Sequence, residues 1–228
     1  TPSASRGGGP GWPRLGGPEN VQKYAEAQVG GFWNRQRARP WVLAGSGDFD
    51  RDQIWAFAKS LPAPDQRKVD VPVPAWGTRP ELDIPMPGRN QAHLMLIFKT
   101  APDTSPDTPA LDLLETSLGG MGGPLFRDLR DKQGLGYTVT AFNRQTSENG
   151  YMVFYIGTEP GKMAQAEEGF KRIINDLHQN LLSEEDVNRG KNQLEGDYYR
   201  NMQSLGSRSG EAAALTMEGY PPSFTNDQ

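Results

Sequence analysis

Two apolar segments joined by a short polar turn place the strongest constraint on the fold of this chain. The first, YTVTAFNRQ, begins at Tyr137, and the second, YMVFYIGTEP, begins at Tyr151. The residues SENG between them are typical turn formers. Strands so close in sequence run antiparallel, so the pair predicts a β-hairpin. The chain is therefore expected to contain an antiparallel sheet.

Helical patterns and one more strand flank this hairpin. The stretch QAHLMLIFKT at 91–100 predicts a strand, and ALDLLETSLGG at 110–120 predicts a helix with a glycine stop. The sequence SEED at 183–186 resembles a capping box and predicts the start of a last long helix. The helix expected over 161–182 carries an apolar stripe formed by Ala166, Phe170, Ile173, Ile174 and Leu177. The order of elements predicts an α+β fold, a two-layer α/β sandwich with a mostly antiparallel sheet covered by helices on one face.

The first ninety residues are less regular. Residues 1–18 are rich in Gly, Pro and Ser and predict a flexible arm or linker, whereas 19–228 would form the domain itself. A helix is expected from Glu19 to about Ala38, followed by a short apolar strand, WVLAG, at 41–45. Asp50 is then a suitable N-cap for a helix that begins at Arg51.

Composition and motifs exclude several classes of function. The net charge of −4 argues against nucleic-acid binding, and no apolar run approaches the roughly 20 residues of a membrane span. Without cysteine there is no thiolate nucleophile and no Cys-ligated metal. The two histidines, His93 and His178, do not form part of H-E-x-x-H or H-x-x-E-H, so the chain is expected to bind no zinc.

The stretch GGMGGPLFRDLRDKQGLGY at 119–137 allows three interpretations. Its glycines could cradle a phosphate at a helix N-terminus, but no Lys or Ser/Thr follows in the position that a P-loop requires. It could simply connect two helices, with Leu125 and Leu129 in the core. Alternatively, Arg130 and Tyr137 could lie together at a sheet edge and donate hydrogen bonds to a peptide carbonyl.

The same stretch resembles the C-terminal, non-zinc-binding half-domain of the pitrilysin/insulinase family of zinc metallopeptidases, peptidase family M16. That family has a Gly-rich turn, then L-F-x-x-L-R, then G-L-(A/G)-Y and a strand, which here read LGGMGGPLFRDLRDKQGLGYTVTAF. The segments PWVLAGSGDFDRDQIWAFAKSLPAP, GYMVFYIGTEPGKMAQAEEGFKRII and LLSEEDVNRGKNQLEGDYYRNMQSLGSRSGEAAALTMEGYP extend the similarity to residues 20–222. The resemblance implies the LuxS/mitochondrial-processing-peptidase-like metallohydrolase fold.

The resemblance also implies a role for each part of the stretch. In the family, an arginine and a tyrosine of this half reach the substrate, and they correspond to Arg130 and Tyr137. The glycines would let the backbone approach an extended, unfolded peptide; they are Gly119, Gly120, Gly122 and Gly123. Zinc would belong to a partner half-domain on the same polypeptide or on a separate subunit. The chain would lack the family's last helix and strand, which residues 1–40 or a second copy, as a homodimer, would replace.

Three alternatives follow from these observations. The chain could be the substrate-binding half of a peptidase, a catalytically inactive scaffold of the same fold, or an unrelated binding module. The family occurs in the periplasm, in organelles and in the cytosol. The Gly/Pro-rich start and the absence of cysteine are the only reasons to favour a bacterial periplasm or envelope over the cytoplasm.

Overall fold

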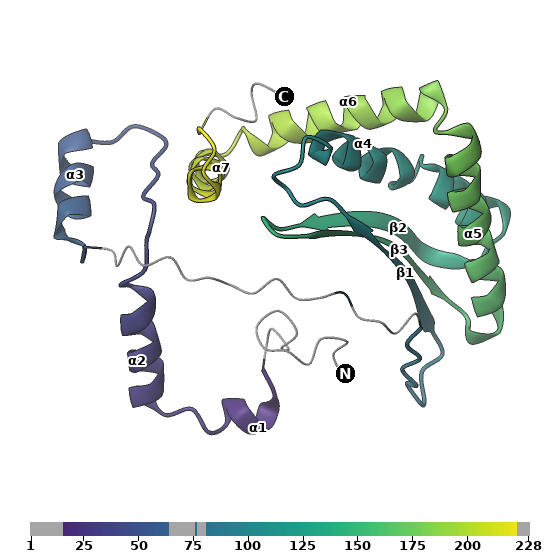
Figure 1. Cartoon of the computed structure of the whole chain (residues 1–228), viewed down its shortest axis with the longest axis horizontal. Helices are drawn as coiled ribbons and strands as arrows, with labels where there is room; N and C mark the ends of the chain where they lie inside the picture. The colour runs from purple at the N-terminus through teal and green to yellow at the C-terminus, as the bar shows by residue number, and fades with distance from the viewer. Residues whose placement is uncertain (1–15, 64–75, 77–80, 223–228) are drawn as a thin grey trace. The chain divides into compact units, whose positions relative to one another are not determined.

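A computed structural model describes residues 16–63, 76 and 81–222 of the chain (Figure 1). The chain divides into two compact units. One unit comprises residues 86–204, and the other combines the described residues up to 85 with the described residues 205–222. Most of the expected flexible arm at 1–18 lies outside the described residues.

The unit of residues 86–204 is built on a three-stranded antiparallel sheet in the order β1-β3-β2. Its strands are β1 (Ala92–Thr100), β2 (Gly136–Gln145) and β3 (Gly150–Thr158). The predicted hairpin is confirmed, because β2 and β3 pair from Gln145 opposite Gly150 up to Gly136 opposite Thr158. Within the described part of the chain, β1 and β2 each pair with β3 alone and form the two edges of the sheet.

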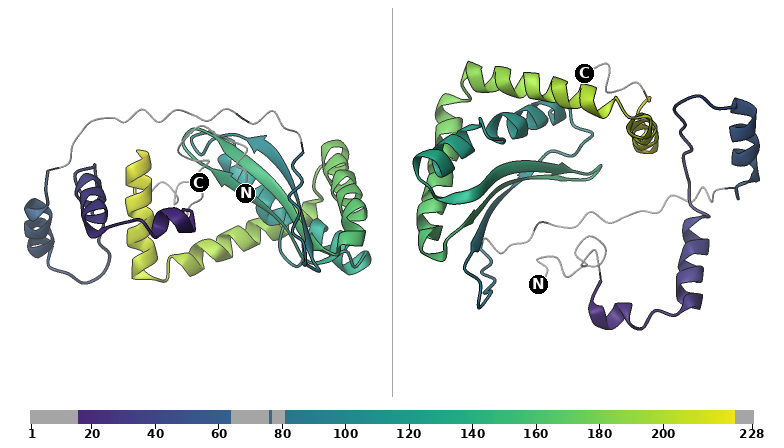
Figure 2. Two further views of the ribbon diagram at one scale, coloured as in Figure 1. Left: turned by 90° about the horizontal axis from the view of Figure 1, so that it is seen from below. Right: turned by 180° about the vertical axis from the view of Figure 1, so that it is seen from behind.

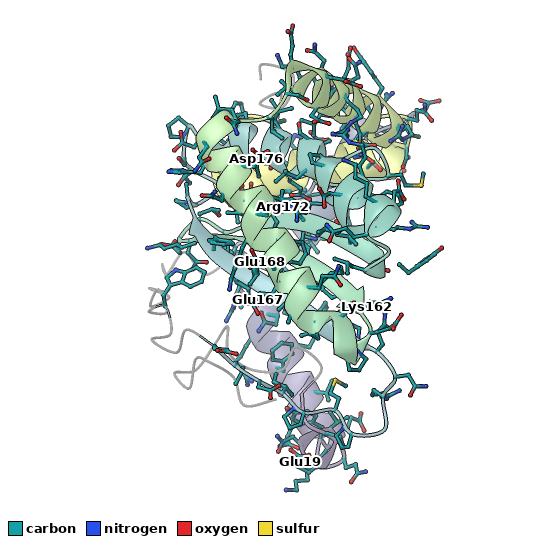
Figure 3. The ribbon with its side chains drawn as sticks, turned by 90° about the vertical axis from the view of Figure 1, so that its right-hand side faces the viewer. Glu19, Lys162, Glu167, Glu168, Arg172 and Asp176 are labelled. Atoms are coloured by element: carbon teal, nitrogen blue, oxygen red, sulfur yellow. The ribbon has the colours of Figure 1, made fainter. Side chains whose placement is uncertain are left out.

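The helices of this unit lie on one face of the sheet, which confirms the α+β prediction (Figures 1 and 2). Helix α4 (Thr108–Leu118) contacts β2, α5 (Met163–Asn180) contacts β1 and β3, and α6 (Glu184–Asn201) contacts α4. A 3-10 turn, η3 (Pro160–Lys162), leads into α5. Figure 3 shows Glu167, Glu168, Arg172 and Asp176 on the outward side of α5.

The hydrophobic core lies between this helical layer and the sheet. Phe170 and Ile156 are fully buried and meet from α5 and β3. The predicted stripe of α5 is confirmed, because Ala166, Phe170 and Ile173 are buried and Ile174 and Leu177 pack against the core. The core cluster consists of Leu118, Leu125, Leu129, Leu135, Val139, Ala141, Met152, Phe154, Ile156, Ala166, Phe170 and Ile173.

The second unit contains α1 (Pro18–Val21), α2 (Glu26–Gln36), α3 (Arg51–Ser60) and α7 (Leu205–Glu218). The predicted cap of α3 is confirmed, because the carboxylate of Asp50 accepts a hydrogen bond from the amide of Asp52 at 2.8 Å. None of the described helices is long and apolar enough to cross a bilayer.

Two predictions for this unit were wrong. The single helix expected over 19–38 is interrupted after Val21, because the side chain of Gln28 accepts a hydrogen bond from the Ala25 amide at 2.9 Å and starts a new helix there. The expected strand at 41–45 is neither helix nor strand. A β-strand requires hydrogen bonds to a neighbouring strand, and no strand of the described residues pairs with this segment.

Candidate functional site

A glycine-rich turn connects α4 to the helix that carries Arg130. The amide of Gly119 donates to the carbonyl of Glu115 at 2.9 Å and ends α4. Gly120 has a φ of 70°, a left-handed conformation that favours glycine. Gly123 is buried, and a Cβ at this position would overlap the carbonyl oxygens of Leu118 and Gly119. Of the four glycines that were expected to approach a peptide, Gly120 and Gly123 are thus required by the conformation and packing of the turn itself.

The helix after this turn is a π-helix, η2 (Phe126–Lys132), whose turns are wider than those of an α-helix. Leu125 and Leu129 are fully buried and anchor it in the core, as the sequence predicted. The chain leaves the helix with a hydrogen bond from the Leu135 amide to the Leu129 carbonyl at 2.8 Å. Short π-helical segments are frequent at functional sites.

Arg130 and Tyr137 lie together at the start of β2, the arrangement that one of the three interpretations of the sequence expected. The guanidinium carbon of Arg130 lies 4.7 Å from the centre of the Tyr137 ring and 4.3 Å from the centre of the Phe126 ring. The Tyr137 side chain is 79% exposed. Among the residues that the structure describes, neither the guanidinium nor the phenol makes a hydrogen bond or an ion pair. Cation–π contact with the ring faces leaves the in-plane N–H groups of Arg130 available to a ligand.

A β-bulge turns Tyr137 out of the sheet. Gly136 is opposite Thr158 and Thr138 is opposite Gly157, so Tyr137 has no partner on β3. Gly136 cannot be replaced by a larger residue without a shift, since a Cβ there would overlap the carbonyl oxygen of Gly157. Bulges often occur next to active sites, where they redirect a side chain.

Two shallow hollows adjoin Tyr137. One, of about 340 Å³, is lined by Asn90, Gln91 and Glu159 among others. The other, of about 230 Å³, is lined by Met121, Phe126 and Val139 among others. Tyr137 borders both hollows, so its phenol stands between two places where ligand side chains could lie.

Behind the turn lies a nearly buried aspartate that holds two arginines. Asp186, which is 4% exposed, accepts hydrogen bonds from Arg127 at 2.8 and 2.9 Å and from Arg189 at 2.9 Å. Ser183, the N-cap of α6, donates to the same carboxylate at 2.8 Å. The sequence predicted the helix start at SEED, but it gave no sign that Asp186 would bind two arginines from different elements.

The residues 37–194 match the family model described as the peptidase M16 inactive domain. The chain belongs to this family. The segment matched contains the glycine-rich turn, the π-helix, the whole sheet and most of α6.

Two bacterial proteins illustrate the sequence similarity of this M16 inactive domain. An uncharacterized zinc protease of Bacillus subtilis, YmxG, is 28% identical over 52% of this chain and 29% of its own length. An uncharacterized zinc protease of Mycobacterium tuberculosis is 24% identical over 87% of this chain and 47% of its own. The chain spans less than half the length of these curated relatives.

Solved structures show the same fold. A protease from Helicobacter pylori matches with a TM-score of 0.78 at 18% identity, over 98% of this chain and 57% of that one. A peptidase M16 inactive domain from Pseudomonas fluorescens matches with a TM-score of 0.74 at 22% identity, over 93% of this chain and 52% of that one.

Metal-ligating residues do not gather in the described part of the M16 inactive domain. The described residues contain no group of three or more His, Cys, Asp or Glu side chains that could hold a metal ion. His93 stacks on Tyr155, with its Nδ1 at 2.8 Å from the phenol oxygen. Because zinc needs three or four ligands held together, the described part of the chain does not fit a zinc site.

Acid is expected to destabilise the domain through Asp186. The hydrogen bonds from Arg127 hold the pKa of this carboxyl well below its usual range against the opposing effect of burial, and Arg189 and Ser183 lower the pKa further. An unfolded aspartate titrates near pH ~3.9, so the stability that this group supplies is complete above about pH 5 and is lost as the pH falls below the unfolded value. Urea unfolding of wild type and Asp186→Asn should give a difference in unfolding free energy that shrinks as the pH falls below about 4. A difference that is independent of pH would contradict this expectation.

Proposed function

We propose that this chain is the non-catalytic, substrate-binding half of a zinc metalloendopeptidase. Its zinc-bearing half would be another part of the same polypeptide or a separate subunit. The observation that carries the proposal is the pair of Arg130 and Tyr137, which lie together at a sheet edge without a hydrogen-bond partner among the described residues. Free donors of this kind can bind a peptide carbonyl.

An extended, unfolded peptide is the ligand that suits this edge. Toward the Tyr137 end of β2, the outer side of the strand has no pairing partner among the described residues, and a peptide could add to it by main-chain hydrogen bonds. Farther along β2, the amide of Asn143 already donates to the carboxylate of Glu115 at 2.8 Å. Such a peptide would pass Tyr137 and place side chains in the hollows beside it. An unfolded segment suits this edge better than a folded protein does, because its main chain is free to become extended.

Arg130 and Tyr137 would have different roles in the reaction. Arg130, held over the rings of Phe126 and Tyr137, would donate to a carbonyl of the substrate as a fixed cation. Tyr137 would donate to the scissile carbonyl as its oxygen gains negative charge. The zinc-bearing half would supply the metal and the water that it activates.

The test is the cleavage of a quenched fluorogenic peptide by this chain together with its zinc-bearing half. We expect Arg130→Ala to lower kcat/KM by about tenfold or more, because a charge-assisted hydrogen bond to the substrate contributes roughly 1.5–3 kcal/mol. The matched control is Arg172→Ala, which removes an arginine that forms an exposed ion pair with Asp128 on the same π-helix at 2.6 Å. Equal activity of the Arg130 and Arg172 variants would contradict the proposal.

A catalytically inactive scaffold within a larger assembly is the second candidate. The absence, among the described residues, of any group that could hold a metal fits this candidate as well as the first. Metal analysis of the intact parent protein decides between the two. A parent without zinc that cleaves no peptide would support the scaffold and would direct the search to a protein partner.

A further inference from the structure

We infer that Asp186 is a positioning residue, and that with Arg127 and Arg189 it forms a clamp that fixes the glycine-rich turn and the start of the π-helix. The effect of the clamp on substrates rests on the function proposed above, but the clamp itself does not. Among the described residues, neither arginine of the clamp makes a cation–π contact with the ring of Tyr137 or Phe126, so the clamp would act through the backbone that carries the site.

Both carboxylate oxygens of Asp186 accept hydrogen bonds. The carboxylate accepts two hydrogen bonds from Arg127, one from Arg189 and one from the Ser183 hydroxyl, all between 2.8 and 2.9 Å. It also lies in the first turn of α6, where the helix dipole stabilises a negative charge. A nearly buried carboxylate is costly unless its oxygens are satisfied in this way.

The two arginines also donate hydrogen bonds to the backbone of the turn and of the helix before it. Arg127 donates to the carbonyl of Gly122 at 2.7 Å, and Arg189 donates to the carbonyl of Ser117 at 2.6 Å. The Ser117 carbonyl belongs to the last turn of α4, where carbonyls lack partners within the helix. The arginines thus hold the turn on both sides of Gly119 and Gly120.

The held segment carries the candidate site. Arg127 lies next to Phe126, and the Phe126 ring is one of the two over which Arg130 lies. Gly120 and Met121 from the turn, together with Phe126, border the smaller of the two hollows. A shift of the turn would therefore move both the support of Arg130 and the wall of this hollow.

The π-helix has a second ion pair that provides a control. Asp128 forms an ion pair with Arg172 of α5 at 2.6 Å, and Arg172 lies on the outward side of that helix (Figure 3). This pair holds the same helix but, among the described residues, makes no hydrogen bond or ion pair with the turn. It differs from the clamp because it does not hold the glycine-rich turn, which is the property that the inference requires.

The test compares Arg127→Lys, which keeps the charge but loses the two-pronged contact, with Arg172→Lys. In the chain alone, we expect amide hydrogen exchange at 117–126 to become about tenfold faster in Arg127→Lys, while exchange in β3 is unchanged. In the assembled peptidase, kcat should fall about tenfold with KM changed less than about threefold, because a misplaced donor mainly affects the reacting complex. The Arg172 variant should leave both measurements unchanged.

Arg189→Met is the second variant. It removes the contact with Ser117 and leaves the pair of Arg127 and Asp186, so it keeps the test possible if Arg127→Lys does not fold. The inference is wrong if amide hydrogen exchange becomes faster by the same factor in β3 and in the turn. It is also wrong if the exchange rate of the turn does not change. Faster exchange confined to the turn with unchanged kcat would also overturn the positioning role. If Arg130→Ala and Tyr137→Phe leave cleavage intact while the turn alone exchanges faster, the proposed function fails and the clamp is supported.

Discussion

Replacing Tyr137 with Phe is expected to lower kcat of the assembled peptidase by about 10²–10³-fold, the usual effect of losing one donor to a developing oxyanion. The substitution removes only the phenol oxygen. It should leave the fold intact, because the Tyr137 side chain is 79% exposed and the phenol makes no hydrogen bond among the described residues. The cation–π contact of Arg130 with the ring would also remain.

The change in kcat should not be accompanied by a large change in KM. The carbonyl of the bound substrate carries little charge, so the hydrogen bond from Tyr137 becomes strong only as the transition state forms. Steady-state kinetics on a fluorogenic peptide separate the two constants. The matched control is Tyr151→Phe at the opposite end of the sheet, where Tyr151 pairs with Arg144 and Lys99. If both variants retain kcat within about threefold, Tyr137 has no part in the reaction.

The elements of the unit of residues 86–204 could be predicted from the sequence because their signals are local. The hairpin of β2 and β3 follows from two apolar segments and a turn, and the stripe on α5 follows from helical spacing. The proximity of Arg130 and Tyr137 was one of three interpretations that the sequence allowed, because the two residues lie close in sequence on either side of a glycine turn. Each of these predictions needed only a short window of the chain.

The details that shape the site could not be predicted in the same way. The π-helix differs from an α-helix in hydrogen-bond register, which no residue pattern in FRDLRDK reveals. The bulge at Tyr137 depends on the register with β3. Asp186 is separated from Arg127 by 59 residues, and its ordinary position in a helix start gives no sign of the contact. The failed strand at 41–45 has the same cause, since apolar residues alone do not supply a pairing partner.

Replacing Gly123 with Ala is expected to lower the free energy of unfolding by about 3 kcal/mol, at the upper end of what overpacking a core position costs. The new methyl group would overlap the carbonyl oxygens of Leu118 and Gly119, and both are backbone atoms that cannot turn aside. Relief would require α4 and the π-helix to separate, although Leu118 and Leu125 are fully buried on either side of the turn. Urea unfolding of the chain measures this loss.

The control for Gly123 is Gly161→Ala in the 3-10 turn η3, where a Cβ would meet nothing within 4 Å. This variant should be as stable as wild type or more stable by up to about 1 kcal/mol, because alanine restricts the unfolded chain. Equal effects at the two positions would show that the turn can open to accept a side chain. The glycine at 123 would then be explained by close approach of a peptide and not by the packing of the turn. The expected difference instead assigns Gly123 to the support of the site, and leaves Arg130 and Tyr137 as the residues that we propose to contact the substrate.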